Sequence, residues 1–564
     1  MRTQPIETDG QRRPTRFSIK LALAGLMLAI PMPVQAGGVT LPDNDTLMRA
    51  LVDEMDRSLK ELTLKDLARP YLIQFRVEDR VGLSMSAQYG GLTSEDRRRS
   101  RSLSTRVRVG GYELDNTNFR QPYGWGSALP IDDNYQALRH AIWLACDTDY
   151  KQGVENLTRK EAYLKTLSKD EDRPVDYTKA EPVVHIDPSA EIAYDEEEWR
   201  RRIIKLSARF QKYPEIQDSN VSFAAGVVNS YVVNTEGTRL RRADTGVYLT
   251  ISADLQAADG MYLADELIYL EESVDRLPSL EEMLTDVDKL CAKLIETSKA
   301  DILEHYVGPV LFDPVAAGQV FDSMLAGLLA ARPVPLGRSA SPEDSMERKI
   351  GIRILPRTFH VYDDPTQERF EDQILAGWYD YDDEGVATGR VQIVEKGVLK
   401  NLVAGRAPTK KIKGTTGHAR ASGFRDPVAI VGCLYFEDEE GLGDDELKEA
   451  LIEAAREEGL DYAIRITGIR GGGGRLGEPI RAYKVFVEDG REVPIRGVEF
   501  LPVQVRSLKR LLAAGKRRKV YNSIGAIGRS VISPAIIAEE LELTKIQEEK
   551  DRLPYLDSPA MRAD

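Results

Sequence analysis

The spacing of hydrophobic residues divides the first half of the chain into alternating helical and strand-like segments. Apolar residues three and four apart predict helices at Leu47–Leu62, Tyr135–Ala145 and Trp199–Phe210. Shorter alternating runs predict strands at Tyr71–Glu78, Leu83–Tyr89 and Ser104–Leu114. The polar, proline-containing stretch 157–195 predicts a loop or mobile insertion in part of its length.

A hairpin and a capped helix follow. Val221–Asn234 and Val247–Leu255 alternate as strands around a glycine-containing turn. Ser279 and Glu282 have the spacing of a capping box, so a helix begins there. We expect this helix to end near His305 and a domain boundary to lie at that point.

Beyond residue 305 the pattern becomes β-rich and is interrupted by glycine. Residues 308–332 predict a short strand, an Asp-Pro turn and a helix rich in Ala and Leu. One further helix is expected between Asp444 and Gly459. The fold class is therefore α+β, with an α/β N-terminal domain over 37–305, a mainly β C-terminal domain over 306–545 and a polar tail over 546–564.

The N-terminus has the features of an export signal. Arg12, Arg13 and Arg16 precede the apolar run Leu21–Ile30, and a small-residue site follows at 34–36. This order is typical of a signal peptide, and the run is too short for an ordinary membrane span. The sequence predicts a signal peptide over 1–36, a periplasmic or secreted location and no stable membrane span; an uncleaved tail or anchor is the alternative.

Charge and cysteine content narrow the function classes. The 564 residues have a net charge of −14, which argues against general nucleic-acid binding because phosphates would not be neutralised. Cys146, Cys291 and Cys433 are widely spaced, so no disulfide framework is expected.

Several stretches, in their order along the chain, resemble the TldD/PmbA family of metallopeptidase-related proteins. They are a strand and turn at 231–237, an Asp-Glu-Gly hairpin at 381–388 followed by 394–401, a Gly- and Arg-containing loop at 417–423, a glycine-rich stretch at 470–474 and a strand segment at 483–497. The resemblance covers roughly residues 60–545. It implies the two-domain architecture of that family and a role related to proteolysis.

The resemblance also places the family's reactive positions. In its active branch a His-Glu-x-x-Gly-His helix and a later Cys hold zinc. When Gly327 is aligned with the motif glycine, Ser323 and Leu328 take the places of the two His, and Met324 takes the place of the Glu. Ile527 takes the place of the Cys. None of these side chains offers the imidazole, thiolate or carboxylate that a zinc peptidase uses. The resemblance therefore implies no metal, no cofactor and no catalytic residue at these degenerate positions.

Other residues offer weaker candidates. The chain has five histidines, and none is paired at helical spacing. His418, with Lys411 and Arg420, lies in a glycine-containing loop whose amides and cations suit a peptide carboxylate; a mobile exposed loop without function is the alternative. Ser422 and Ser323 are nucleophiles by residue type only, because no nucleophile elbow surrounds either.

These observations leave three hypotheses. The first is an exported, metal-free subunit that supports peptide binding beside a TldD-like catalytic partner, or as a homodimer. The second is a non-catalytic exported binding or scaffold protein. The third is a divergent hydrolase with a rebuilt site.

Overall fold

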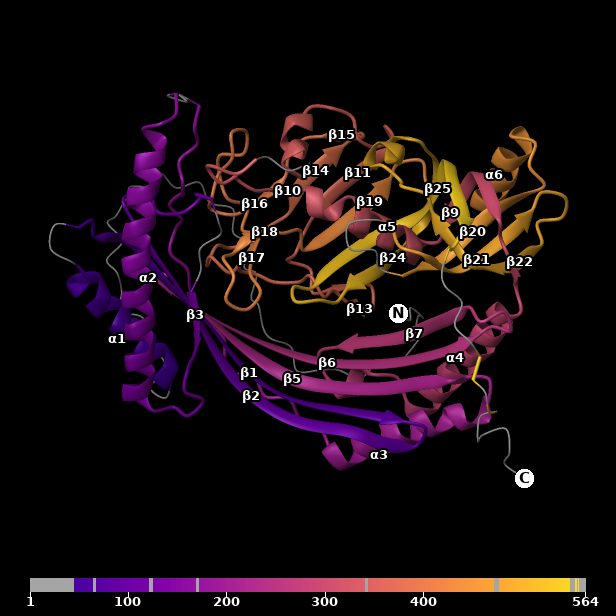
Figure 1. Cartoon of the computed structure of the whole chain (residues 1–564), viewed down its shortest axis with the longest axis horizontal. Helices are drawn as coiled ribbons and strands as arrows, with labels where there is room; N and C mark the ends of the chain where they lie inside the picture. Colours follow the sequence, from indigo (N-terminus) through magenta and orange to yellow (C-terminus); the bar gives the residue numbers. More distant parts are fainter. Residues whose placement is uncertain are drawn as a thin grey trace, which may run out of the picture.

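The protein folds as two stacked layers of sheet and helix. The computed structural model describes residues 45–63, 67–120, 125–168, 172–339, 343–470, 476–547, 553–554 and 556. The N-terminal sheet curves beneath the C-terminal sheet, with α1 and α2 at one end and α3 and α4 below it (Figure 1). The expected signal peptide and most of the polar tail lie outside the described residues.

The N-terminal sheet has the order β3-β2-β1-β5-β6-β4, and β7 pairs with β6. Its strands are β1 (Pro70–Gln88), β2 (Gly91–Val109), β3 (Trp125–Ala128), β4 (Val184–Ile186), β5 (Asp218–Asn234), β6 (Arg239–Gln256) and β7 (Tyr262–Glu271). Its helices are α1 (Thr46–Glu61), α2 (Tyr135–Leu164), α3 (Glu196–Ala208) and α4 (Leu280–Ser298).

Two apolar clusters fix these helices to the sheet. Alternate residues of the long strands, among them Phe223 and Leu249, face α3 and α4, and Trp199 of α3 stacks on Phe223 at 4.3 Å between ring centroids. The other ends of the strands pack against α1 and α2 through residues such as Phe75. The period-two pattern therefore places these apolar side chains on the helix-covered face.

A row of glycines crosses the middle of this sheet. Gly82 pairs with Gly226, and Gly226 pairs with Gly246 on the next strand. A Cβ at Gly226 would lie 2.8 Å from the carbonyl oxygen of Val81, so the strands approach too closely there for any side chain. Glycine within strands is typical of a bend, and the sheet curves toward the C-terminal layer (Figure 1).

The C-terminal sheet has the order β15-β14-β11-β19-β25-β9-β20-β21-β22-β8, with β23 and β24 also on β25. The strands are β8 (Asp301–Ile302), β9 (His305–Phe312), β11 (Phe359–Asp363), β14 (Val391–Glu395), β15 (Val398–Leu399), β19 (Cys433–Asp438), β20 (Tyr462–Ile469), β21 (Pro479–Phe486), β22 (Glu492–Arg496), β23 (Val498–Phe500), β24 (Leu511–Ser523) and β25 (Arg529–Lys545). Short pairs outside it are β10 (Ala330–Ala331) with β16 (Val403–Ala404), β12 (Arg369–Phe370) with β13 (Gln373–Ile374), and β17 (Ala419–Arg420) with β18 (Val428–Ala429).

Two helices cover opposite faces of this sheet. Phe312 of β9 belongs to the cluster that contains Phe321 of α5 (Pro314–Met324), whereas the adjacent Leu311 belongs to the cluster of α6 (Asp444–Glu457). Because neighbouring strand residues point to opposite faces, β9 is covered on both sides.

The α+β class is confirmed, but several expected boundaries are wrong. Residues 70–88 form one strand rather than two, and α2 runs to Leu164 into the stretch expected to be partly loop. The helix that begins with the Ser279 capping box ends at Ser298, and α5 ends at Met324 rather than continuing to residue 332. The domain boundary near His305 stays a prediction; β8, which precedes it, already pairs with β22 in the C-terminal sheet.

Arginines of the N-terminal sheet reach across to loops of the C-terminal layer. Arg242 pairs with Asp383 at 3.0 Å, and Arg106 pairs with Asp426 and donates to the carbonyl of Phe424. These contacts, which we call the interdomain seam, also include a hydrogen bond from Gln74 Nε2 to the carbonyl of Asp383 at 3.2 Å. In the described part of the chain, no helix is long and apolar enough to cross a membrane.

The packing of α5 can be tested by truncating its largest buried side chain. Phe321 is 0% exposed and stacks on Phe436 with 3.9 Å between ring centroids. We expect Phe321→Ala to lower the free energy of unfolding by about 3–5 kcal/mol, measured by denaturant titration, and Phe321→Leu to cost less. A change below about 1 kcal/mol for Phe321→Ala would contradict this packing.

Candidate functional site

The end of α5 and the turn between β24 and β25 meet, as the resemblance requires. Asp322 pairs with Arg529 at 2.9 Å. Asp322 precedes Ser323 in the chain, and Arg529 lies two residues after Ile527. The sequence positions that resemble the zinc ligands therefore come from two segments that are in contact.

These positions carry no metal-ligating groups other than the Ser323 hydroxyl. Met324 is 7% exposed and belongs to the C-terminal core, against which Leu328 also packs. Leu328 lies in a 3₁₀ turn, Ala326–Leu328, and not on the helix. Among the residues that the structure describes, no group of three or more His, Cys, Asp or Glu side chains is placed to hold a metal ion.

A pocket opens beside this place, between the two layers. Gly327 lines it, and its cavity volume is about 310 Å³. Its charged lining residues are Arg108, Arg332, Arg338, Arg406, Glu347, Glu384 and Asp426. Much of the remaining lining is apolar and includes Phe119, Pro333, Leu402 and Val428. This size and mixture are typical of ligand-binding pockets. We refer to it as the interdomain pocket.

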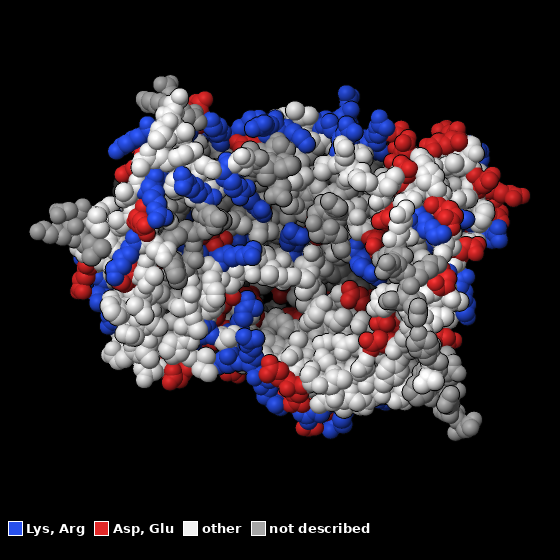
Figure 2. Space-filling view, in the orientation of Figure 1, with Lys and Arg blue, Asp and Glu red and all other residues white. Residues whose placement is uncertain are grey.

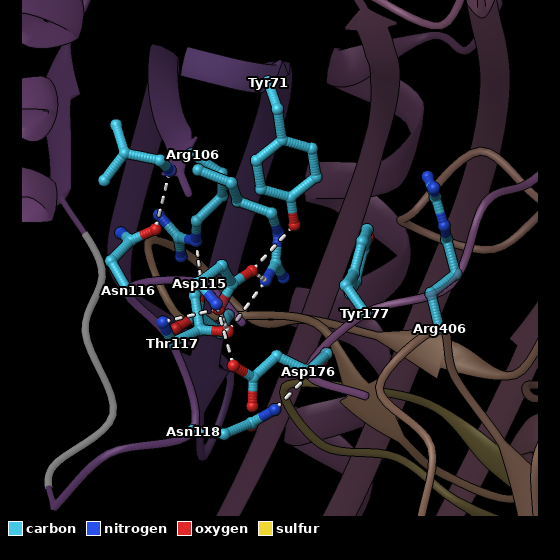
Figure 3. A network of polar contacts seen from close by, with 12 residues as sticks. Tyr71, Arg106, Asp115, Asn116, Thr117, Asn118, Asp176, Tyr177 and Arg406 are labelled. Carbon is cyan, nitrogen blue, oxygen red and sulfur yellow. Dashed lines mark hydrogen bonds and ion pairs between the residues drawn. The ribbon is translucent and has the colours of Figure 1, made fainter. Parts of the chain in front are cut away.

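Two arginines in one wall of the interdomain pocket, Arg108 and Arg406, both contact the ring of Tyr177, which lies behind the lining. The guanidinium carbon of Arg108 lies 3.6 Å from the ring centroid of Tyr177, and that of Arg406 lies 4.3 Å from it. Figure 3 shows Tyr177 beside Arg406, with the Asp115 network on its other side. Cation–π contact stabilises a guanidinium group next to an aromatic ring. The ring of Tyr177 therefore helps to stabilise two positive charges that lie close together.

Acidic groups beneath the wall fix these cations. Arg108 pairs with Asp115 at 2.8 Å, and Arg406 pairs with Glu236 at 2.7 Å. Asp115 also accepts from Tyr71 and Thr117. Burial acts to raise the pKa of Asp115, but Arg108 and the hydrogen bonds of Thr117 outweigh it and lower that pKa. Asp115 is therefore a fixed anion, and the wall is preorganised.

Glu384 connects the wall to the Asp-Glu-Gly hairpin. Its carboxylate accepts from the hydroxyl of Tyr177 at 3.0 Å and from the backbone N–H of Arg406 at 2.7 Å. Burial raises the pKa of Glu384, against the opposing effect of Arg406. Burial and the charge of Glu384 also raise the pKa of Asp382 to about 7.

A second buried pair supports the loop that carries Asp115. Lys160 of α2 contacts Asp176 at 2.5 Å, and Asp176 accepts from the backbone N–H of Asp115 at 2.8 Å. Burial lowers the pKa of Lys160 and raises that of Asp176. The sequence predicts a shorter helix here, whereas α2 runs to Leu164, and its later turns carry Lys160 to this site.

The expectation of an accessible histidine is wrong. His418 is 0% exposed, and its Nδ1 lies 2.7 Å from the carbonyl oxygen of Thr416. Its Nε2 lies 3.0 Å from Asp363, which is also fully buried. The loop folds inward because short strands pair at Ala419 and Ala429. In this conformation the ring of His418 is enclosed by protein groups, and its role in substrate binding stays a prediction.

The other two predicted binding residues lie outside the pocket lining. Arg420 pairs with Asp383 at 3.4 Å and lies over the ring of Tyr379 at 4.2 Å, a ring that His418 also contacts. Lys411 has an exposed side chain, and its backbone N–H donates to Glu347. The structure brings His418 and Arg420 together on Tyr379 but does not join Lys411 to them.

Sequence reasoning missed the residues that build the wall. Arg108, Tyr177 and Arg406 come from three distant segments, and no spacing rule relates them. Arg406 follows the buried pair Val403–Ala404, and an arginine directly after an apolar run was the one available signal. Glu384 lies in the Asp-Glu-Gly hairpin, which the sequence does single out.

Comparisons with known proteins agree with this arrangement. A family model described as the PmbA/TldA metallopeptidase C-terminal domain matches residues 305–545. A metalloprotease of Archaeoglobus fulgidus is 26% identical over 195 residues, which are 34% of this chain and 41% of that protein. A metalloprotease of Methanothermobacter thermautotrophicus is 24% identical over 339 residues, which are 59% of this chain and 69% of that protein. The matched part is thus less than half the length of the first relative.

Solved structures show the same fold. TldE from Thermococcus kodakarensis matches with a TM-score of 0.55 and 14% identity, covering 88% of this chain and 100% of that chain. A protein described as a putative modulator of DNA gyrase from Thermotoga maritima matches with a TM-score of 0.56 and 14% identity, covering 88% of this chain and 99% of that chain.

The structural role of His418 can be tested through its buried partner. We expect His418→Ala to lower the free energy of unfolding by about 1–3 kcal/mol, because it leaves the buried Asp363 carboxylate without the imidazole that it faces. Replacing both residues, as His418→Leu with Asp363→Leu, should cost less than the sum of the single changes. Denaturant unfolding of the four proteins checks this, and additive costs would contradict the pairing.

Proposed function

Because the chain belongs to the TldD/PmbA family, whose members are related to proteolysis, we propose that it is a metal-free subunit that holds peptide substrate beside a metallopeptidase partner. One observation carries the proposal. The two segments that carry the positions resembling zinc ligands are in contact through Asp322 and Arg529, yet those positions hold Ser323, Met324, Leu328 and Ile527. The scaffold of the site is kept and its imidazole and thiolate donors are replaced.

The interdomain pocket supplies the binding part of this proposal. It lies beside Gly327, next to the place where a zinc-bearing relative would cut. Its arginines and apolar residues can hold a peptide without any metal. The partner that we propose is a TldD-like catalytic chain, with a homodimer as the alternative. The N-terminal pattern supports an exported location for the assembly.

The buried state of His418 bears on the alternatives. A rebuilt hydrolase would need a base within reach of substrate, and His418 has both ring nitrogens facing protein oxygens. Ser422 is only partly buried, but the histidine near it in sequence, His418, faces Thr416 and Asp363. A non-catalytic binding or scaffold protein uses the same pocket and differs from our proposal only in lacking a peptidase partner.

The purified full chain should contain no stoichiometric zinc and should not cleave unfolded casein. Elemental analysis and a cleavage assay with and without a chelator measure this. Recovery of a His-Glu-x-x-Gly-His relative with the tagged chain from its own cells would support the subunit role over the scaffold role. Chelator-sensitive cleavage by the lone chain would refute the proposal.

A gain-of-metal variant tests the alignment of the degenerate positions. We expect the triple change Ser323→His, Leu328→His and Ile527→Cys to bind one zinc ion per chain, because two imidazoles and a thiolate are a sufficient protein ligand set. The matched control is the same set with Ile527→Ser, which should bind zinc more weakly. A folded triple variant without zinc would show that these positions do not converge.

A further inference from the structure

The interdomain pocket contains a guanidinium nitrogen that lacks a protein acceptor. Arg406 has a fully buried side chain, and its Nε and Nη2 donate to the carbonyl of Thr178, while Nη2 also contacts Glu236. Its Nη1 has no partner among the residues that the structure describes. Buried donors in native proteins are nearly always satisfied by protein or ordered water, and a ligand in the pocket can supply the acceptor that this nitrogen lacks.

The charges around the pocket also favour an anion. Arg338 is exposed at the pocket, and none of the described ion pairs includes its side chain. The acidic lining residues are already engaged: Asp426 pairs with Arg106, and Glu347 accepts from Thr409 and from the backbone of Lys411. Burial raises the pKa of Glu384, which disfavours its charged form. Since Arg108 and Arg406 are paired with Asp115 and Glu236, the positive charge that is open to a ligand at the pocket is that of Arg338.

The shape of the pocket restricts what the anion belongs to. A volume of about 310 Å³ suits one or two amino-acid residues rather than a long segment. Pro333, Leu402 and Val428 offer apolar contact for a side chain. A guanidinium group matches the planar geometry of a carboxylate and can hold it with two parallel hydrogen bonds.

We propose that the interdomain pocket binds the free C-terminal carboxylate of a peptide through Arg406 and Arg338. The chain would then select polypeptide ends over internal segments and fix the distance from the end to the neighbouring partner. This inference rests on the proposed function, because it names the part of the substrate that the pocket takes.

The test compares three fluorescein-labelled pools of randomised pentapeptides by fluorescence anisotropy with the full chain. The first has free carboxyl ends, the second has amidated ends, and the third is amidated with one added Asp, which restores the net charge. We expect the free-acid pool to bind at least tenfold more tightly than either amidated pool. Arg338→Gln should reduce this preference at least threefold, whereas Arg456→Gln, an exposed control on α6, should leave it unchanged.

Arg406→Lys gives a second variant that keeps the charge and removes the paired donors, and we expect it to reduce the preference as well. Equal binding of the acid and amidated pools would overturn the inference and leave the proposed function standing. A preference that survives both Arg338→Gln and Arg406→Lys would also overturn the assignment to this pocket. If none of the three pools binds, both the inference and the peptide-holding role are overturned. The zinc and partner measurements are independent of this result.

Discussion

The interdomain seam is the interaction on which the rest of the structure depends. Arg76 and Arg106 of the N-terminal sheet are almost fully buried, and their acceptors, the carbonyl of Gly423 and the carboxylate of Asp426, belong to the C-terminal layer. Guanidinium groups cannot shed their charge, so each needs its acceptor in place. Since the loss of one partner of a buried ion pair is costly, the two layers stabilise each other, and the pocket between them has walls from both.

The candidate site lies where the end of α5 meets the β24–β25 turn, with the interdomain pocket beside it. α5 still packs through Phe321 against the C-terminal sheet, and its end still meets the β24–β25 turn. What has changed is the set of atoms presented there. Next to it, Asp115 and Glu236 fix two arginines around Tyr177, so the site offers preorganised donors to an anion.

Local patterns in the sequence predicted the elements well where one physical rule decides them. The capping box at Ser279 and the strand at 221–234 lie where expected, because a helix cap and the alternation of apolar residues are local properties. The strand expected at 247–255 begins earlier, at Arg239. The extent of α2 was missed, because its later turns are held by tertiary contacts such as the buried Lys160–Asp176 pair. The burial of His418 was missed for the same reason: charge and glycine content suggested an exposed loop, and its partner Asp363 lies 55 residues earlier in the sequence. The pocket wall needs three segments at once, and no single-sequence rule brings them together.

The short strand β8 has a mechanical consequence. It follows α4 after two residues and is hydrogen-bonded to β22, so the polypeptide enters the upper sheet before the covalent connection to β9 is reached. A linker anchored at this point cannot serve as a free hinge. The opening between the layers is visible as the hollow at the centre of Figure 2. The connection between the two layers is thus held within a sheet instead of running as an unpaired linker.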